Sequence, residues 1–182
     1  MAQTAPQFAD DAAQWTGPEG MLVQPATAQI LQARGLKAFF AYWTARAAGH
    51  FAPRRAHIEP RDMASLLPHL HLYDVIEGGT SFRLRVMGTA LVAAIGADQT
   101  GRILTDTDQD LPARRAMAAM RDVVAGKMGV RTSASRVAAT KPSVLAVESL
   151  WLPLSEDGAT VSQILGCSIM SEPQDLRPGF NQ

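Results

Sequence analysis

Cysteine is almost absent from this chain of 182 residues, since Cys167 is the only one. A single cysteine excludes an internal disulfide framework and a zinc cage built from cysteine thiolates. The N-terminus lacks a cationic patch followed by an apolar stretch, so no signal peptide is visible. No apolar run approaches the ~20 residues that cross a bilayer. We therefore expect a cytoplasmic protein without membrane insertion.

An excess of charge of one sign is missing as well, because Lys plus Arg and Asp plus Glu both total 17. A protein that binds duplex nucleic acid needs a cationic face that releases counterions from the phosphates. A small positive excess between Arg34 and Arg61 is interpreted as a solvated helix face, with an acidic partner surface as the alternative. We expect no nucleic-acid partner.

Hydrophobic residues make up 47% of the chain and charged residues 19%, which is typical of a globular domain that needs neither disulfides nor metals. Residues 1–26 mix Gln, Ala, Gly and Pro and are predicted to form a flexible arm, although Trp15, Met21 and Leu22 could dock. Residues 171–182 are polar and are predicted to form a tail. A single domain is expected over residues 27–170, with N-terminal helices at 27–68 and a core at 69–170.

Two helices are predicted ahead of the core. Thr27 can cap the first, Gly35 weakens its first turns, and Gly49 ends it. Pro60 suits the start of a second, short helix that Pro68 closes and whose buried face is Met63, Leu66 and Leu67. Apolar residues spaced by three and four positions form a stripe along the first helix: Leu36, Phe39, Phe40, Trp43 and Ala47.

Alternation of apolar and polar residues predicts five strands, at residues 71–76, 81–87, 128–137, 144–154 and 161–170. In the second strand we expect one dry face made of Phe82, Leu84 and Val86. A short helix at 88–95 and a longer one that Asp110 caps separate the second strand from the third. This order predicts an α+β domain, an antiparallel sheet with helices packed on one face.

Several short segments between residues 32 and 170 carry a family resemblance through their shared order: Tyr42-Trp43, Pro53-Arg54-Arg55, Ile58-Glu59-Pro60-Arg61-Asp62-Met63, Leu66-Leu67-Pro68, Leu72-Tyr73-Asp74-Val75, Phe82-Arg83-Leu84-Arg85-Val86-Met87-Gly88-Thr89, Gly96-Ala97-Asp98-Gln99-Thr100-Gly101-Arg102 and Leu152-Pro153-Leu154. The chain resembles a bacterial family of small stand-alone PAS-like proteins. The resemblance implies a PAS-like five-stranded sheet flanked by helices, with an N-terminal helical extension. It also implies a role in signalling or regulation, and it fixes no single ligand.

Each cofactor of PAS domains can be tested by residue type. Flavin photosensors of this superfamily carry a Cys near the position of residues 99–102, and haem-binding members carry a His on the long helix. This chain has neither, so we expect a colourless protein with no covalent flavin and no haem. A noncovalent small ligand remains open. On the elements that border a PAS pocket, core packing is favoured and ligand contact is the alternative for five apolar residues: Leu84, Ile95, Met117, Met120 and Trp151.

The remaining polar candidates carry weak patterns. His69 and His71 share one face of a strand but lack further ligands, so we interpret them as surface or hydrogen-bonded histidines and predict no metal site. Arg102 is interpreted as a structural partner of an acidic side chain such as Asp98, with anion binding as the alternative. We assign no catalytic residue.

The sequence thus favours a sensory module, not an enzyme, that acts by binding a small molecule or a partner signalling protein. The alternative is a small hydrolase or isomerase that uses a pair such as His71 and Asp74. We further expect a homodimer in which Phe39, Phe40 and Trp43 form the contact, because exposed aromatic stripes usually meet a partner. Burial of the stripe within its own domain is the competing interpretation.

Overall fold

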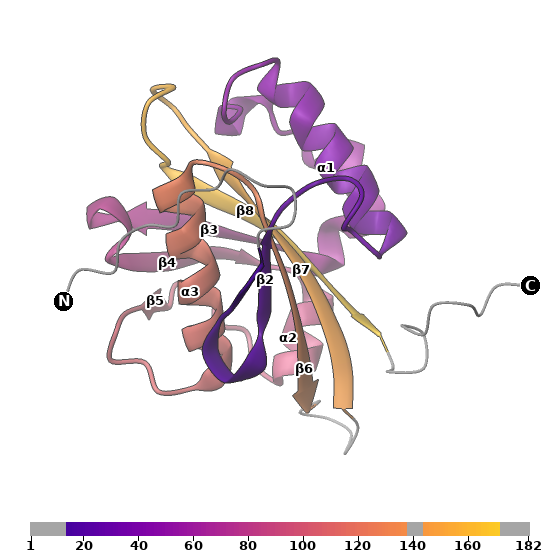
Figure 1. Ribbon diagram of the computed structural model, residues 1–182, viewed down its shortest axis with the longest axis vertical. Coiled ribbons are helices and arrows are strands. Elements are labelled where there is room, and N and C mark those ends of the chain that lie inside the picture. Colours follow the sequence, from indigo (N-terminus) through magenta and orange to yellow (C-terminus); the bar gives the residue numbers. More distant parts are fainter. Residues whose placement is uncertain (1–13, 138–143, 172–182) are drawn as a thin grey trace, which may run out of the picture.

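An antiparallel sheet forms the centre of the protein in this computed structural model, which describes residues 14–137 and 144–171 (Figure 1). Within these residues the sheet has eight strands in the order β1-β2-β6-β7-β8-β3-β4-β5. Their bounds are Trp15–Thr16 (β1), Leu22–Pro25 (β2), Leu70–Ile76 (β3), Ser81–Met87 (β4), Ile103–Leu104 (β5), Val130–Val137 (β6), Val144–Leu154 (β7) and Gln163–Ser171 (β8).

The five strands predicted from the sequence are β3, β4, β6, β7 and β8, and they are adjacent in the sheet. The prediction of only five strands was wrong, because three short strands extend the two edges. β1 and β2 come from the segment expected to be a flexible arm; β2 pairs with β6, and Val23 is fully buried. The remainder of that arm, residues 1–13, and the tail at 172–182 lie outside the described residues.

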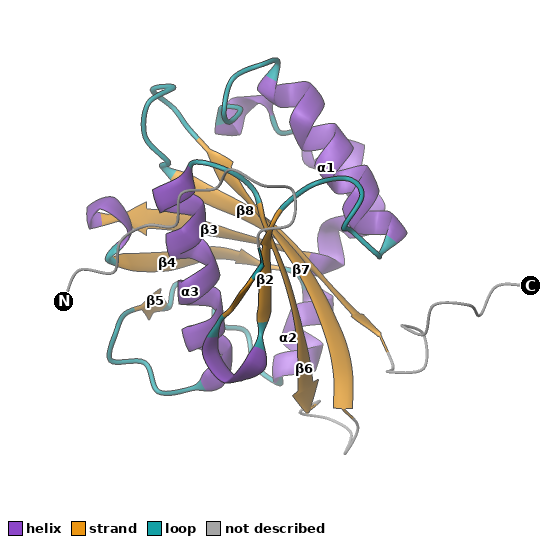
Figure 2. Ribbon diagram, in the orientation of Figure 1, coloured by secondary structure: helices purple, strands orange, loops and turns teal. Residues whose placement is uncertain are grey.

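Helices cover both faces of the sheet, which corrects the expectation of helices on one face (Figures 1 and 2). The α-helices are Arg34–Ala47 (α1), Thr89–Ile95 (α2) and Leu111–Gly126 (α3). Four 3-10 segments accompany them: Pro18–Gly20 (η1), Arg55–His57 (η2), Pro60–His69 (η3) and Glu77–Gly79 (η4). Within the described residues no helix is both long and apolar enough to span a bilayer.

Two hydrophobic cores result, one on each face. The core under α3 contains Phe82, Met117, Met120 and Ile164. The core under α1 and η3 contains Phe39, Leu152 and other apolar residues from β3, β7 and β8. Because side chains alternate along a strand, neighbouring residues of one strand contribute to opposite cores.

Helix α1 packs on the sheet of its own chain, and this corrects the expectation that its aromatic stripe is exposed for a dimer contact. Phe39 is fully buried, Trp43 is 7% exposed, and Phe40 is partly buried in the same core. The Trp43 indole donates a hydrogen bond to the carbonyl oxygen of Pro153, at 2.9 Å. The aromatic stripe therefore covers the sheet of the same chain, which was the competing interpretation, and Phe39 and Trp43 have almost no exposed surface.

The start of α1 also differs from the prediction. The helix begins at Arg34, so Thr27 is not its cap, and Ala33 in the N-cap position has no side chain that could serve. The carboxylate of Glu148 on β7 takes over this role and accepts hydrogen bonds from the backbone N–H groups of Gln32 and Ala33, at 2.9 and 2.8 Å. A buried ion pair with Arg131, at 2.8 Å, holds Glu148 in place.

Strand β4 follows the predicted alternation only in part. Phe82 and Leu84 are buried, whereas Val86 is 47% exposed. The pairing of β4 with β3 shifts by one residue between Leu84 and Val86, since their partners Tyr73 and Leu72 are consecutive. The extra residue reverses the alternation beyond it, which turns Val86 outward. The prediction was also wrong for Leu67 on η3, which we expected to be buried and which is 41% exposed.

Candidate functional site

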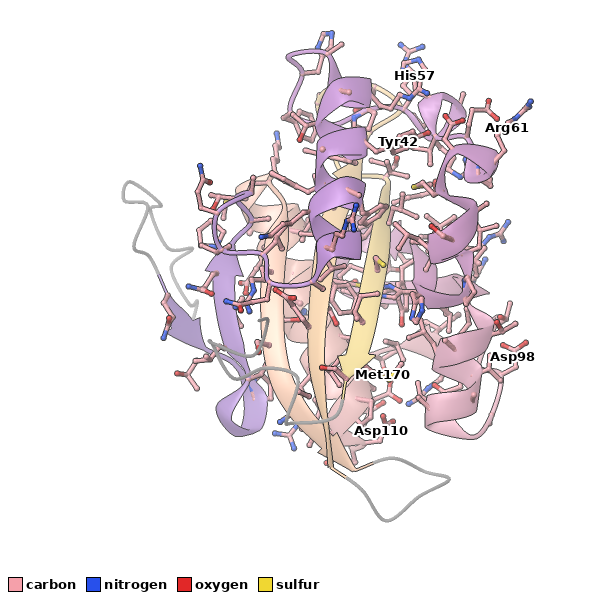
Figure 3. All side chains as sticks on the ribbon, turned by 90° about the vertical axis from the view of Figure 1, so that its right-hand side faces the viewer. Tyr42, His57, Arg61, Asp98, Asp110 and Met170 are labelled. Atoms are coloured by element: carbon pink, nitrogen blue, oxygen red, sulfur yellow. The ribbon has the colours of Figure 1, made fainter. Side chains whose placement is uncertain are left out.

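A cavity of about 430 Å³ lies between the sheet and the helices α2 and α3. Most of the residues around it are apolar, and Met170, one of them, lies toward the end of the molecule opposite His57 and Arg61 (Figure 3). The sheet contributes His71, Tyr73, Leu84, Met87, Leu104, Thr132, Ala134, Val147, Ser149, Trp151, Ser168 and Met170. The other lining residues are Met21, Leu91, Ile95, Gln99, Leu111, Pro112, Ala113, Arg115 and Ala116.

Strand periodicity determines which residues reach the cavity. Along β7 the lining residues are Val147, Ser149 and Trp151, while the intervening Leu150 and the following Leu152 belong to the opposite core. Strand β8 alternates in the same way, so its cavity-facing side chains are those in register with the cavity-facing positions of β7. The sheet thereby brings residues far apart in sequence onto one wall.

A polar floor, made of His71, Thr132, Ser149 and Ser168, interrupts the apolar wall. All four residues are at most 8% exposed. Nε2 of His71 lies 3.1 Å from the Ser168 hydroxyl, which lies 2.7 Å from the Ser149 hydroxyl. The Trp151 indole donates to the hydroxyl of Thr132 at 3.0 Å. The floor thus combines a hydrogen-bonded chain of His71, Ser168 and Ser149 with the separate hydroxyl of Thr132, all of them neutral groups at the base of an apolar space.

His71 is held rigidly by its neighbours. Its ring centroid lies 4.5 Å from that of Trp151 and 5.7 Å, edge-on, from that of Tyr73. Complete burial lowers the pKa of the imidazole to about 3, so His71 is neutral at physiological pH. Its Nδ1 atom is buried and has no hydrogen-bond partner among the described residues. The same burial raises the pKa of the Tyr73 phenol above its ordinary value.

The segment between α2 and α3 is fixed by Arg102. Its guanidinium donates hydrogen bonds to the side chains of Gln99, Asp108 and Asp110. Asp110 also caps α3, as predicted, by accepting from the backbone N–H of Ala113 at 2.9 Å. Asp98, the acidic partner suggested by the sequence, bonds to Thr100 instead. Arg102 therefore holds the segment between α2 and α3 against the start of α3, the helix that covers the cavity.

The pocket candidates from the sequence fall into two groups. Leu84, Ile95 and Trp151 line the cavity. Met117 and Met120 are buried in the core under α3 and are not among the lining residues. All four side chains belong to the buried face of α3, on which Ala113 and Ala116 line the cavity. The polar floor was missed, although period-two spacing places Ser149 on the same strand face as Trp151.

Other chemistry considered from the sequence is not assembled here. Asp74 bonds to Gln163 at 2.8 Å and pairs with Arg85 at 3.5 Å, whereas the hydrogen bond of His71 goes to Ser168. Cys167 packs in the core on the opposite face of the sheet, and burial raises the pKa of its thiol to about 12. In the described part of the chain, no three His, Cys, Asp or Glu side chains cluster as a metal site would require.

Comparison with known proteins assigns a family to this architecture. Residues 31–169 match the PAS_5 family, described as a PAS domain. Among solved structures the chain is similar to an RNA-binding light-oxygen-voltage receptor, at 13% identity and a TM-score of 0.47, over 84% of this chain and 39% of that chain. It is also similar to a LOV protein of Rhodobacter sphaeroides, at 12% identity and a TM-score of 0.41, over 62% and 68% of the two chains. No curated protein matches.

Proposed function

This chain belongs to the PAS domain family, and we propose that it is a sensory module that binds a small molecule in the cavity between the sheet and helices α2 and α3. The cavity itself is the observation that carries the proposal. Protein interiors rarely hold voids larger than a water molecule, whereas ligand sites enclose ~300–1,000 Å³ of mostly apolar space with a few oriented polar groups. The 430 Å³ cavity with its polar floor fits the second description.

The polar floor supports binding over catalysis. Ser168 and His71 lie at the distance of a nucleophile and its general base, which is the one arrangement that favours a hydrolase. A working base of this kind has a third group that orients it and stabilises its charged form. Nδ1 of His71 has no such partner among the described residues, and the low pKa of the imidazole makes it a weak proton acceptor.

We also propose that the signal leaves through contact with a partner protein. Strands β6 and β7 connect the cavity to the opposite face, because Thr132 and Ser149 on the floor adjoin Arg131 and Glu148 in sequence. Glu148 in turn holds the first residues of α1. A ligand that shifts the floor residues would therefore also move β6 and β7, the strands that hold the Arg131–Glu148 ion pair at the start of α1.

The experiment is a fragment screen by ligand-observed NMR on the wild type and two matched variants. Ala116→Phe places a ring in the cavity, whereas Ala125→Phe adds the same ring to an exposed position of the same helix. We expect fragments that bind the wild type to bind Ala125→Phe equally and to lose binding to Ala116→Phe. Equal binding to all three folded proteins, or no binding to any, would reject the cavity as the ligand site.

A further inference from the structure

The polar floor carries no charge. Among the described residues that line the cavity, Arg115 is the single charged one, and it extends from α3, the helix that covers the sheet. Its guanidinium donates to the carbonyl oxygen of Pro18 at 3.3 Å. None of the four floor residues carries a charge, so an ionised group placed against the floor would find no counterion on it, which is unfavourable. The floor therefore favours a neutral group.

The protons of the floor can be counted along its chain of hydrogen bonds. Neutral His71 has one N–H, and its Nδ1 is buried without a partner among the described residues. A buried N–H without an acceptor is costlier than an unpaired lone pair, so the proton belongs on Nε2. From there the imidazole donates to Ser168, and in the bond between the Ser168 and Ser149 hydroxyls either one can be the donor.

Two hydroxyl hydrogens of the floor are without an acceptor among the described residues. One belongs to Ser149 or Ser168, because the bond between these two hydroxyls uses only one of their two hydrogens. The other belongs to Thr132, whose hydroxyl accepts from the Trp151 indole and keeps its own O–H. The floor therefore presents hydrogen-bond donors to whatever enters the cavity, with the rings of Trp151 and Tyr73 beside them.

We infer that the cavity takes a neutral, mainly apolar molecule bearing a carbonyl-type hydrogen-bond acceptor, and that this acceptor meets the hydroxyls of the polar floor. The inference rests on the proposed function and adds the chemical class of the ligand. The apolar walls bind the body of the molecule, and the floor hydroxyls fix its orientation. An unpaired donor in a dry cavity discriminates against a ligand that lacks an acceptor.

Three probes of one shape test this inference: acetophenone, benzoate and isopropylbenzene, which carry an acetyl, a carboxylate or an isopropyl group on the same ring. Their dissociation constants are measured by saturation-transfer NMR titration on the full chain. We expect acetophenone to bind about tenfold more tightly than isopropylbenzene, which leaves the donor unpaired. We expect benzoate to bind weakest, because no residue of the floor carries a charge that could pair with its carboxylate.

Variants locate the donor. Ser149→Ala should reduce the preference for acetophenone over isopropylbenzene, and Ser149→Ala combined with Ser168→Ala should reduce it further. Ser155→Ala removes the hydroxyl of a buried serine outside the cavity and should leave the preference unchanged. Melting curves establish that each variant is folded.

The outcomes separate the two proposals. Tightest binding of benzoate, or equal binding of acetophenone and isopropylbenzene to the wild type, would overturn the assigned ligand class while the cavity remains a binding site. An acetophenone preference that is undiminished in the double variant would overturn the role of the serine hydroxyls. If Ala116→Phe leaves the binding of all three probes unchanged, the proposed function fails, and the inference fails with it.

Discussion

The imidazole of His71 lies directly against the backbone of Gly166 on the neighbouring strand. The two residues pair in the register of β3 and β8, and a Cβ atom at position 166 would collide with the ring. Glycine at this position is therefore required by the space that the imidazole occupies. The same contact keeps Nε2 of His71 within reach of Ser168 and thus defines the geometry of the polar floor.

Gly166→Ala should destabilise the protein, because either the ring or the strand has to move. We expect a loss of about 1–3 kcal/mol in the free energy of unfolding, typical of overpacking in a core. The matched background is His71→Ala, which removes the ring. A double-mutant cycle in urea should show that Gly166→Ala costs much less once the imidazole is gone. Additive costs would contradict the contact.

Stability should depend on pH through His71. The unfolded chain binds a proton on this residue below about pH 6.5, whereas the folded chain takes it up only near pH 3. The free energy of unfolding should therefore fall as the pH drops below 6.5, by up to ~1.4 kcal/mol per pH unit. The slope between pH 7 and pH 5 should be smaller for His71→Gln and unchanged for the exposed His57→Gln. Equal slopes in all three proteins would refute the buried neutral imidazole.

Trp43 is expected to be a core residue in every assay. Trp43→Phe removes the donor to the Pro153 carbonyl and leaves that buried oxygen unpaired, at a cost of about 1–3 kcal/mol. Trp43→Asp should fail to fold, because a carboxylate would be buried without a partner. Lys37→Asp, on the exposed face of α1, is the control. A folded, monomeric Trp43→Asp would show that the stripe is an intermolecular surface after all.

Glu148→Gln should be among the most damaging single substitutions. It leaves the buried guanidinium of Arg131 without its counterion and weakens the cap of α1, which predicts a loss of ~3–5 kcal/mol. Hydrogen exchange at the first residues of α1 should accelerate as well. Glu156→Gln provides the control, since this exposed carboxylate also accepts from a backbone N–H, that of Arg55. A cost below ~1 kcal/mol, close to that of ordinary surface substitutions, would argue against Glu148 as the group that holds the start of α1.

Local signals in the sequence predicted the elements that depend on local physics. Asp110 caps α3 as expected, and the short helix expected at 88–95 is α2, which Gly96 ends, because caps act within a few residues. The family resemblance was confirmed by the match to residues 31–169. The start of α1 was placed wrongly because its cap is Glu148, 115 residues from Ala33. A contact of that separation leaves no local pattern.

Three other errors share this non-local origin. Strand β2 is only four residues long and ends in Pro25, so its sequence resembles that of a loop. It forms a strand because it pairs with β6, a distant segment of the chain. The irregular pairing that exposes Val86 depends on how β4 meets β3. The choice between dimer contact and core packing for Trp43 was settled by its position above Pro153. In each case the deciding partner lies on a distant segment.

The candidate site was predicted to a similar extent. The family resemblance suggested Leu84 and Trp151 as pocket candidates and both line the cavity, whereas which residues of the buried face of α3 border it, Ala116 and not Met117, depends on packing. His71 was considered as a metal ligand because of its spacing from His69. Its partners Ser149 and Ser168 come from two other strands, so the polar floor exists only after the sheet has formed.

Small-molecule binding in the cavity is tested most directly by native mass spectrometry of the wild type and Ala116→Phe after incubation with the small-molecule fraction of a bacterial cell extract. We predict one bound small molecule per wild-type chain that denaturation releases and that Ala116→Phe does not retain. Ala125→Phe should bind it like the wild type. A wild type that stays empty, or an identical bound mass on both the wild type and Ala116→Phe, would contradict binding in the cavity.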